Sequence, residues 1–212
     1  GFDFWMGYLD QGQAHNYYPT HLWRNGQKYP LPGNVLSDHP RARGRVASRK
    51  VTWSHPVMTE EAFAFIRESG DQPFLLHVHW TIPHANNEGG RVHGDGMEVP
   101  DYGVYKEQDW VNTSKGQAAM VSWMDRDVGR LVDLLRELKL ERRTLVIFTS
   151  DNGFFCGSHG YGSKVLPYEE STNVPLIVFD PRHSSSGKKL RSAALTANID
   201  VAPTILELAG LE

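Results

Sequence analysis

The chain has 212 residues and 40% hydrophobic content, enough for one large domain or for part of a larger one. Its formal net charge of -3 gives no argument for a nucleic-acid partner, and no apolar run approaches the length of a membrane span. The single cysteine, Cys156, excludes an internal disulfide and leaves the redox compartment undecided.

The N-terminal region, residues 1–57, is rich in aromatic and turn-forming residues and has no sustained period, so it predicts mostly irregular structure. The Asn25-Gly26 pair lies between mixed apolar and polar flanks and predicts a β-hairpin. The basic segment 41–50 (RARGRVASRK) is the one local excess of positive charge. We interpret it as a solvated loop rather than as a nucleic-acid site.

The middle of the chain alternates between helical and extended patterns. A helix is predicted over residues 59–68, with Thr59 as its N-cap and Gly70 as its stop. The run 73–80 (PFLLHVHW) predicts a buried strand, and His84 follows just beyond its carboxyl end, where ligands gather in open α/β sheets. Residues 85–112 have no clear period and predict a long loop, which in a compact domain is usually functional or disordered.

The second half carries the strongest helix, over residues 115–139, whose apolar residues recur at spacings of three and four. This stripe consists of Ala118, Val121, Met124, Val128, Leu131, Leu135 and Leu138. Buried strands are predicted at 144–149 and 174–179, with a candidate edge strand at 190–195 and a short helix from about Val201 to a Gly210 cap. This alternation predicts an α/β fold in which a mostly parallel sheet is sandwiched between helices.

The stretch 143–164 (RTLVIFTSDNGFFCGSHGYGSK) places polar groups directly after the 144–149 strand. Asp151 and Asn152 offer oxygen atoms, which suit a hard cation such as calcium or magnesium. The alternative is a plain turn, because Asn-Gly is a common turn former.

A glycine-rich loop follows this pair, and its backbone can approach a ligand closely. His159 and Lys164 lie in the loop, and both side chains can donate hydrogen bonds to anionic oxygens. A pair of potential metal ligands, a glycine-rich loop and a lysine together indicate a site that binds an anionic ester beside a cation.

Three separated blocks share one further pattern: IPHANN at 82–87, MDRDVGRLVDLLRELKLERRTLVIFTSDNG at 124–153 and GSHGYGSKVLPYEESTNVPLIVFDP at 157–181. Together they closely resemble the sulfatase family of the alkaline-phosphatase-like superfamily, and the resemblance spans essentially the whole chain. It implies an alkaline-phosphatase-like α/β fold and hydrolysis of a sulfate monoester. The implied substrate is a small-molecule sulfate ester or a sulfated glycan.

The resemblance also implies roles for individual residues. Asp151 and Asn152 match the family's second pair of calcium ligands, with magnesium as the other cation to consider. His84 matches the histidine that contacts the sulfate group and Lys164 the lysine on its far side, so both are expected to bind substrate and to act in catalysis. His159 falls in a Gly-x-His-Gly variant of the loop and is expected to line the substrate pocket or to lie just behind it.

Two parts of the family pattern are missing from this sequence. The motif Cys/Ser-x-Pro-Ser-Arg, whose first residue becomes the formylglycine nucleophile, does not occur, and neither does an Asp-Asp pair. Residues 1–212 are therefore expected to be the central-to-late part of a sulfatase catalytic domain, without the formylglycine region or the C-terminal small domain, and to be inactive alone. Family habit places such proteins in the periplasm, outside the cell or in the lysosome, and the oligomeric state stays open.

Two other functions remain. A phosphodiesterase or phosphonate monoester hydrolase of the same superfamily would use a similar metal frame, although Asn152 in place of histidine favours a sulfatase. A non-catalytic binding protein on a degenerate sulfatase frame is the alternative from a different class.

Overall fold

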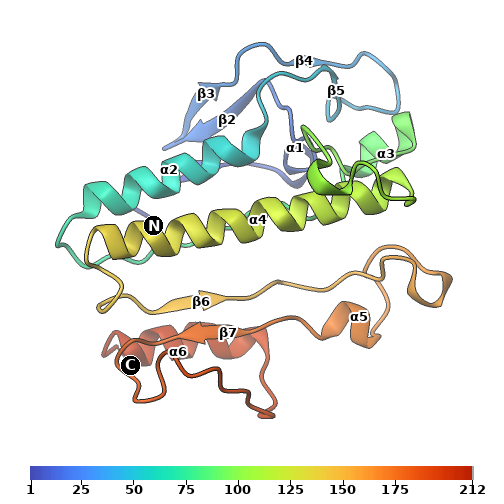
Figure 1. Ribbon diagram of the computed structural model, residues 1–212. Helices are drawn as coiled ribbons and strands as arrows, with labels where there is room; N and C mark the ends of the chain where they lie inside the picture. Colours follow the sequence, from blue (N-terminus) through green and yellow to red (C-terminus); the bar gives the residue numbers. More distant parts are fainter. Residues whose placement is uncertain (212) are drawn as a thin grey trace. The chain divides into compact units, whose positions relative to one another are not determined.

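The computed structural model describes residues 1–211, and the chain divides into two compact units (Figure 1). The first unit is Gly1–Leu138, and the second begins at Lys139. None of the helices in residues 1–211 is both long and apolar enough to cross a membrane.

The first unit opens with a three-stranded antiparallel sheet in the order β1 (Met6–Gly7), β2 (His21–Arg24) and β3 (Gln27–Pro30). The hairpin predicted at Asn25-Gly26 is confirmed and connects β2 to β3. Both turn residues have positive φ, 49° and 81°. This is the backbone that a two-residue turn needs to match the twist of its strands, and it explains the Asn-Gly pair.

The N-terminal region also supplies most of the unit's aromatic core. The region also contains a short helix, α1 (Gln11–Ala14), and a two-stranded antiparallel sheet of β4 (Val35–Leu36) and β5 (Ala47–Arg49). The core is a cluster of buried side chains drawn from well-separated segments: Tyr17, Tyr18, Ala47, Trp53, Ile82, Met97 and Met120. Aromatic residues that lack a sequence period can therefore still build a core, because their partners come from elsewhere in the chain.

Helix α2 (Ser54–Ser69) begins earlier than predicted, so the N-cap role of Thr59 is wrong. Thr59 is fully buried inside the helix, and its hydroxyl donates to the carbonyl of His55 at 2.9 Å. Pro56 is tolerated in the first turn because N–H groups there have no helical acceptor. The predicted stop is confirmed, since Gly70 ends the helix with a φ of 56°.

Helix α4 (Asn112–Glu137) confirms the predicted helix apart from its ends and runs alongside α2 (Figure 1). Its buried side matches the predicted apolar stripe only in part: Leu135 is buried and Met124 packs against the core, but Val121 is 43% exposed. The fully buried positions are Gly116, Ala119, Met120, Asp127, Leu134 and Leu135. One of them is a carboxylate, which the apolar periodicity could not indicate.

This carboxylate, Asp127, forms a buried pair with His55 of α2. The two side chains are 0% exposed, and 2.8 Å separates His55 Nε2 from Asp127 Oδ2. Arg126 and Arg130 donate to the other oxygen at 2.9 and 3.1 Å. Burial lowers the pKa of His55 below its ordinary value, and the pKa of Asp127 is also lowered, because hydrogen bonds from His55, Arg126 and Arg130 outweigh the effect of burial.

The free energy of unfolding of the 212-residue chain should fall as pH is lowered from about 7 to about 5. Unfolded His55 binds its proton at the ordinary pKa of 6.5, whereas the folded pKa is lower, so protons bind the unfolded state preferentially below pH 6.5. Asp127 contributes in the same direction only below its ordinary pKa of 3.8. Urea unfolding at several pH values measures the slope. A His55→Gln variant cannot titrate at this position and should lose part of the slope; an unchanged slope would contradict this role.

Residues 73–80 differ from the prediction, since they form no strand. Their exposure alternates along the chain, and Leu75 is 55% exposed, so the segment is not buried on both faces. The reason is that a strand requires a hydrogen-bonded neighbour, and no segment within residues 1–211 pairs with this one. The predicted loop 85–112 instead contains helix α3 (Asn87–His93) and a 3-10 turn, η1 (Gly103–Tyr105).

The second unit contains one two-stranded sheet, β6 (Val146–Phe148) with β7 (Ile177–Phe179), and short helical elements. These elements are η2 (Ser158–Gly160), α5 (Glu169–Thr172), η3 (Asn198–Asp200) and α6 (Val201–Leu208). The helix predicted from Val201 is confirmed, and Gly210 follows it with a φ of 72°. The candidate strand at 190–195 does not form.

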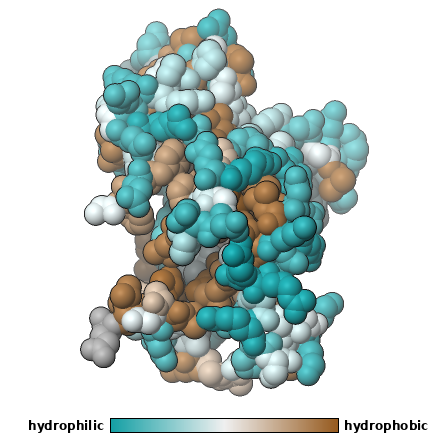
Figure 2. Space-filling view, turned by 90° about the vertical axis from the view of Figure 1, so that its left-hand side faces the viewer, coloured by the Kyte–Doolittle hydropathy of each residue, from teal (hydrophilic) through white to brown (hydrophobic). Residues whose placement is uncertain are grey.

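The α/β class is confirmed, but the strands differ from the predicted parallel, buried sheet. β6 and β7 are antiparallel, as are all other strand pairs in residues 1–211. Parallel neighbours need a crossover connection, usually a full helix, whereas between β6 and β7 the chain forms only the 3-10 turn η2 and the four-residue helix α5. Two strands and α6 cannot cover both sheet faces, so Ile177 is 60% exposed, and apolar side chains reach the surface in the lower part of Figure 2.

Candidate functional site

Asp151 and Asn152 lie shortly after β6, at the carboxyl end of the strand, as the sequence predicts. One Asp151 carboxylate oxygen accepts hydrogen bonds from the Asn152 N–H at 2.9 Å and from the Ser150 hydroxyl at 3.4 Å. Asn198 donates to the backbone carbonyls of Ser150 and Asp151, both at 3.1 Å. The backbone of the pair is thus held from the N-terminal side of α6, while the Asp151 side chain is exposed.

Gly153 explains why a glycine follows the pair, and the reason is not the turn that the Asn-Gly dipeptide suggests. Its φ is not positive. Its N–H donates to the Ser171 carbonyl at 2.9 Å, and an added Cβ would lie only 2.1 Å from the Glu170 carbonyl oxygen. The glycine therefore allows α5 to approach the backbone directly behind Asn152.

The pair fits part of a coordination shell for a hard divalent cation. Asp151 and Asn152 offer a carboxylate and a carboxamide oxygen, the donor types that calcium and magnesium prefer, and calcium takes six to eight of them. Within residues 1–211 no group of three or more His, Cys, Asp or Glu side chains could hold a metal ion. The pair alone would supply a minority of the ligands.

The glycine-rich loop after the pair has a backbone with several left-handed residues. Cys156, Gly157, His159, Gly160 and Ser163 all have φ between 51° and 98°. These left-handed residues turn the chain tightly through η2, and the glycines among them adopt the left-handed conformation without strain. The loop is also held by apolar packing, because Phe155 is buried and its ring contacts those of Tyr161 and Tyr168.

His159 and Lys164 have different surroundings in this loop. His159 is tied to α5, because its Nε2 lies 3.0 Å from Glu170 Oε1 and its ring lies 5.1 Å from that of Tyr168. Lys164 is half-buried, and no residue in 1–211 pairs with its ammonium group. A half-buried lysine without a protein anion is suited to bind an anionic ligand.

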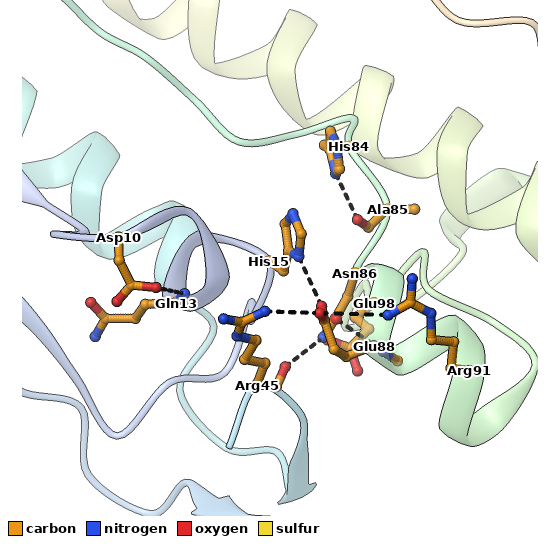
Figure 3. A network of polar contacts seen from close by, with 11 residues as sticks. Asp10, Gln13, His15, Arg45, His84, Ala85, Asn86, Glu88, Arg91 and Glu98 are labelled. Atoms are coloured by element: carbon orange, nitrogen blue, oxygen red, sulfur yellow. Dashed lines mark hydrogen bonds and ion pairs between the residues drawn. The ribbon is translucent and has the colours of Figure 1, made fainter. Parts of the chain in front are cut away.

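His84 belongs to the first unit and is held at both its backbone and its ring (Figure 3). Its N–H donates to the Thr81 carbonyl at 2.9 Å, and its own carbonyl accepts a hydrogen bond from the Tyr17 hydroxyl. Its Nδ1 lies 2.6 Å from the Ala85 carbonyl, which can only accept, so Nδ1 carries a proton. The ring stacks on His15, with centroids 5.4 Å apart and planes 11° from parallel.

Beside this stack, Glu88 is the centre of a buried polar network (Figure 3). The residue is 3% exposed, and its carboxylate accepts from His15 Nδ1 at 2.8 Å and from Arg45 Nη1 at 3.1 Å, with Arg91 at 3.9 Å. Burial opposes the charged form, but the hydrogen bonds from His15 and Arg45 outweigh it, so the pKa of Glu88 is lowered. Glu88 is therefore ionised at neutral pH.

Asn86 joins this network to the start of α3. Its carboxamide oxygen accepts from Gly89 N–H at 2.9 Å as the helix N-cap, and its NH₂ donates to the Arg45 carbonyl at 3.0 Å and to Glu98 at 2.8 Å. Sequence reasoning missed His15, Glu88 and Asn86. The available signal was Asn86 followed by Gly94, a cap at each end of a helix too short and glycine-rich to show an apolar stripe.

Of the predicted site residues, four lie in the second unit and His84 lies in the first. The four are Asp151, Asn152, His159 and Lys164. Their expected roles toward a cation and a substrate stay predictions.

Comparison with known proteins gives one consistent family. The sequence model of the sulfatase family matches residues 1–211. The N-acetylglucosamine-6-O-sulfatase of Bacteroides thetaiotaomicron is 39% identical, and the match covers 99% of this chain and 39% of that protein. Arylsulfatase K of Bos taurus is 26% identical, with 97% and 45% covered. The chain thus spans less than half the length of these curated relatives.

Solved structures agree in fold. The crystal structure of Ps i-CgsB in complex with k-i-k-neocarrahexaose has a TM-score of 0.72 and 23% sequence identity, over 100% of this chain and 46% of that chain. Such structural neighbours have the alkaline-phosphatase-like fold, of which the chain forms a part.

Proposed function

The chain belongs to the sulfatase family, and from this we propose that the full-length protein hydrolyses sulfate monoesters. The observation that carries the proposal is the family match over residues 1–211, supported by 39% identity to a named sulfatase across nearly the whole chain. Residues 1–212 would be the central-to-late part of the catalytic domain, and the formylglycine nucleophile would come from residues outside this sequence. The chain alone is then expected to have no turnover.

A sulfated glycan is the favoured substrate class. The support is the similarity to an N-acetylglucosamine-6-O-sulfatase and to an endo-4-O-sulfatase of Bacteroides thetaiotaomicron, 28% identical over 100% of this chain. A small-molecule sulfate ester is the second possibility within the same reaction. The family's compartments, the periplasm, the cell exterior or the lysosome, are compatible with a glycan substrate.

Asp151 and Asn152 would hold calcium, or magnesium in its place, through their side-chain oxygens. A bound divalent cation stabilises negative charge on the oxygens of the transferred group. The Lys164 ammonium would stabilise the same charge from the glycine-rich loop, and charge placed in advance in this way is usually the largest catalytic contribution. His159, which is tied to Glu170, would line the pocket.

His84 would contact the sulfate and, with Lys164, is a candidate donor of a proton to the leaving oxygen. Because Nδ1 of His84 is engaged by the Ala85 carbonyl, contact with substrate would use Nε2. A protonated imidazole is a donor at both nitrogens, so the carbonyl at Nδ1 is compatible with a proton at Nε2. As the nucleophile, which would come from outside this sequence, bonds to sulfur and the ester S–O bond breaks, that proton would pass to the departing alcohol oxygen.

The proposal is tested by offering the full-length protein a matched set of esters and measuring the released acid. The set contains N-acetylglucosamine 6-sulfate, an aryl sulfate, the corresponding phosphodiester and a phosphonate monoester. Turnover of a sulfate ester with the highest kcat/KM is the expected result. Preference for the phosphodiester or phosphonate would assign the protein to another branch of the superfamily, and no turnover of any ester would support a binding protein.

A further inference from the structure

The His15 ring lies between His84 and Glu88 (Figure 3). It stacks on the His84 ring with centroids 5.4 Å apart, and its Nδ1 lies 2.8 Å from Glu88 Oε2. We propose that His15 and Glu88 form a positioning pair that holds the His84 imidazole in a single orientation. The catalytic consequence of this pair rests on the proposed function, whereas the positioning itself does not.

Glu88 is a fixed anchor for the His15 ring. It is 3% exposed, and both of its carboxylate oxygens are occupied, Oε2 by His15 and Oε1 by Arg45. Hydrogen bonds to an ionised acceptor are shorter and stronger than those between neutral groups. Rotation of the His15 ring would break this bond and leave a buried donor and a buried charged acceptor unsatisfied, which is unfavourable.

The stack transmits this constraint to His84. The hydrogen bond from His84 Nδ1 to the Ala85 carbonyl exists only for one rotation of the ring about its Cβ–Cγ bond. A parallel neighbour, with planes 11° apart, restricts that rotation, while Tyr17 holds the His84 backbone through its carbonyl. A ring that is fixed in this way presents Nε2 in one direction, and such supporting contacts are how sites keep their reacting groups aligned.

A purely structural tie between the segment after α1 and helix α3 is the competing explanation. It accounts for the ion pair but not for the parallel stack on His84. It also does not account for His15 Nε2, which is buried and has no hydrogen-bond partner within residues 1–211. A buried unpaired nitrogen lowers stability, and such groups in native proteins often have a functional reason.

The test uses the full-length protein labelled with ¹⁵N at histidine, with His15→Ala, His15→Phe and His15→Asn variants and His93→Ala as the matched control. His93 is an exposed histidine of α3 outside the network. Phenylalanine keeps the flat ring against His84, whereas asparagine keeps a donor for Glu88 but no ring. In wild type the His84 signals should report a proton held on Nδ1, whether the ring is neutral or cationic. His15→Ala and His15→Asn should show exchange of this proton, His15→Phe should show less exchange because its ring remains against His84 without the bond to Glu88, and His93→Ala should show none.

The same variants have a kinetic consequence. In His15→Ala, kcat should fall by roughly 10–100-fold with KM changed much less, and His15→Phe should recover only part of the loss. Unchanged His84 nitrogen signals in both His15→Ala and His15→Asn would overturn the proposal, whatever the melting temperatures. A wild type without sulfatase turnover would instead refute the proposed function, and the nitrogen signals would still decide the positioning role.

Discussion

Replacement of Lys164 by alanine in the full-length protein should lower kcat/KM for a sulfate ester by about 10²–10³-fold. The reason is that the Lys164 ammonium is half-buried in the glycine-rich loop and pairs with no residue in 1–211, so its charge is available to the negative charge that develops during cleavage. Folding should barely change, by about 0.5 kcal/mol or less, because no protein contact of the ammonium is lost. Steady-state kinetics and thermal unfolding of the same sample measure both.

Lys189→Ala is the matched control for this variant. Lys189 is an exposed lysine of the same unit, in the irregular segment that follows β7. Its removal should leave kcat/KM within about twofold of wild type. If Lys164→Ala retains wild-type kcat/KM, or if its loss of activity equals that of Lys189→Ala, Lys164 does not bind the sulfate group.

The largest effect on stability is expected from Asp127→Ala, at about 2–4 kcal/mol of unfolding free energy. His55 is fully buried and would lose the only acceptor found for it within residues 1–211, while its Nδ1 is already unpaired. Arg126 and Arg130 are 45% and 41% exposed, so they can return to water at little cost. For a chain of this length the loss corresponds to a fall in Tm of roughly 5–15 °C.

Asp133→Ala controls for the helix itself. Asp133 lies on the same helix, is 73% exposed and pairs with Arg136 at 2.9 Å on the surface. Both aspartate-to-alanine substitutions raise the helix propensity by the same amount. An exposed ion pair such as that of Asp133 and Arg136, however, contributes only about 0–1 kcal/mol to the free energy of unfolding. Calorimetry should therefore give a clearly lower melting temperature for Asp127→Ala than for Asp133→Ala. Equal melting temperatures would mean that the buried pair contributes nothing to holding α2 against α4.

Local signals in the sequence predict the elements that depend on local chemistry. The Asn25-Gly26 hairpin needs only two residues with positive φ, and α4 is long enough for its periodicity to be unambiguous. The run 73–80 has the composition of a strand, but a strand also needs a neighbour, and the sequence of one segment does not contain its partner. For the same reason the direction of β7 relative to β6 could not be read from composition.

The residues of the candidate site also fall into those that a local sequence signal could place and those that depend on a distant partner. Asp151 and Asn152 could be placed because they directly follow an apolar run that does form β6. The pair of His15 and Glu88 could not, because 73 residues separate them and neither lies in an apolar pattern. Resemblance to the sulfatase family adds roles for His84 and Lys164, which the structure places on separate units, but it gives no indication of the network behind His84.

The most direct test of sulfatase chemistry in this protein is peptide mass mapping of the complete, full-length product. We expect one peptide in which a cysteine or serine in an x-Pro-x-Arg context carries the mass of formylglycine. That result would fix the reaction class and leave only the sulfate ester to be identified. A complete map without such a residue would contradict the proposed function, and Asp151, Asn152, His84 and Lys164 would lose the roles proposed for them.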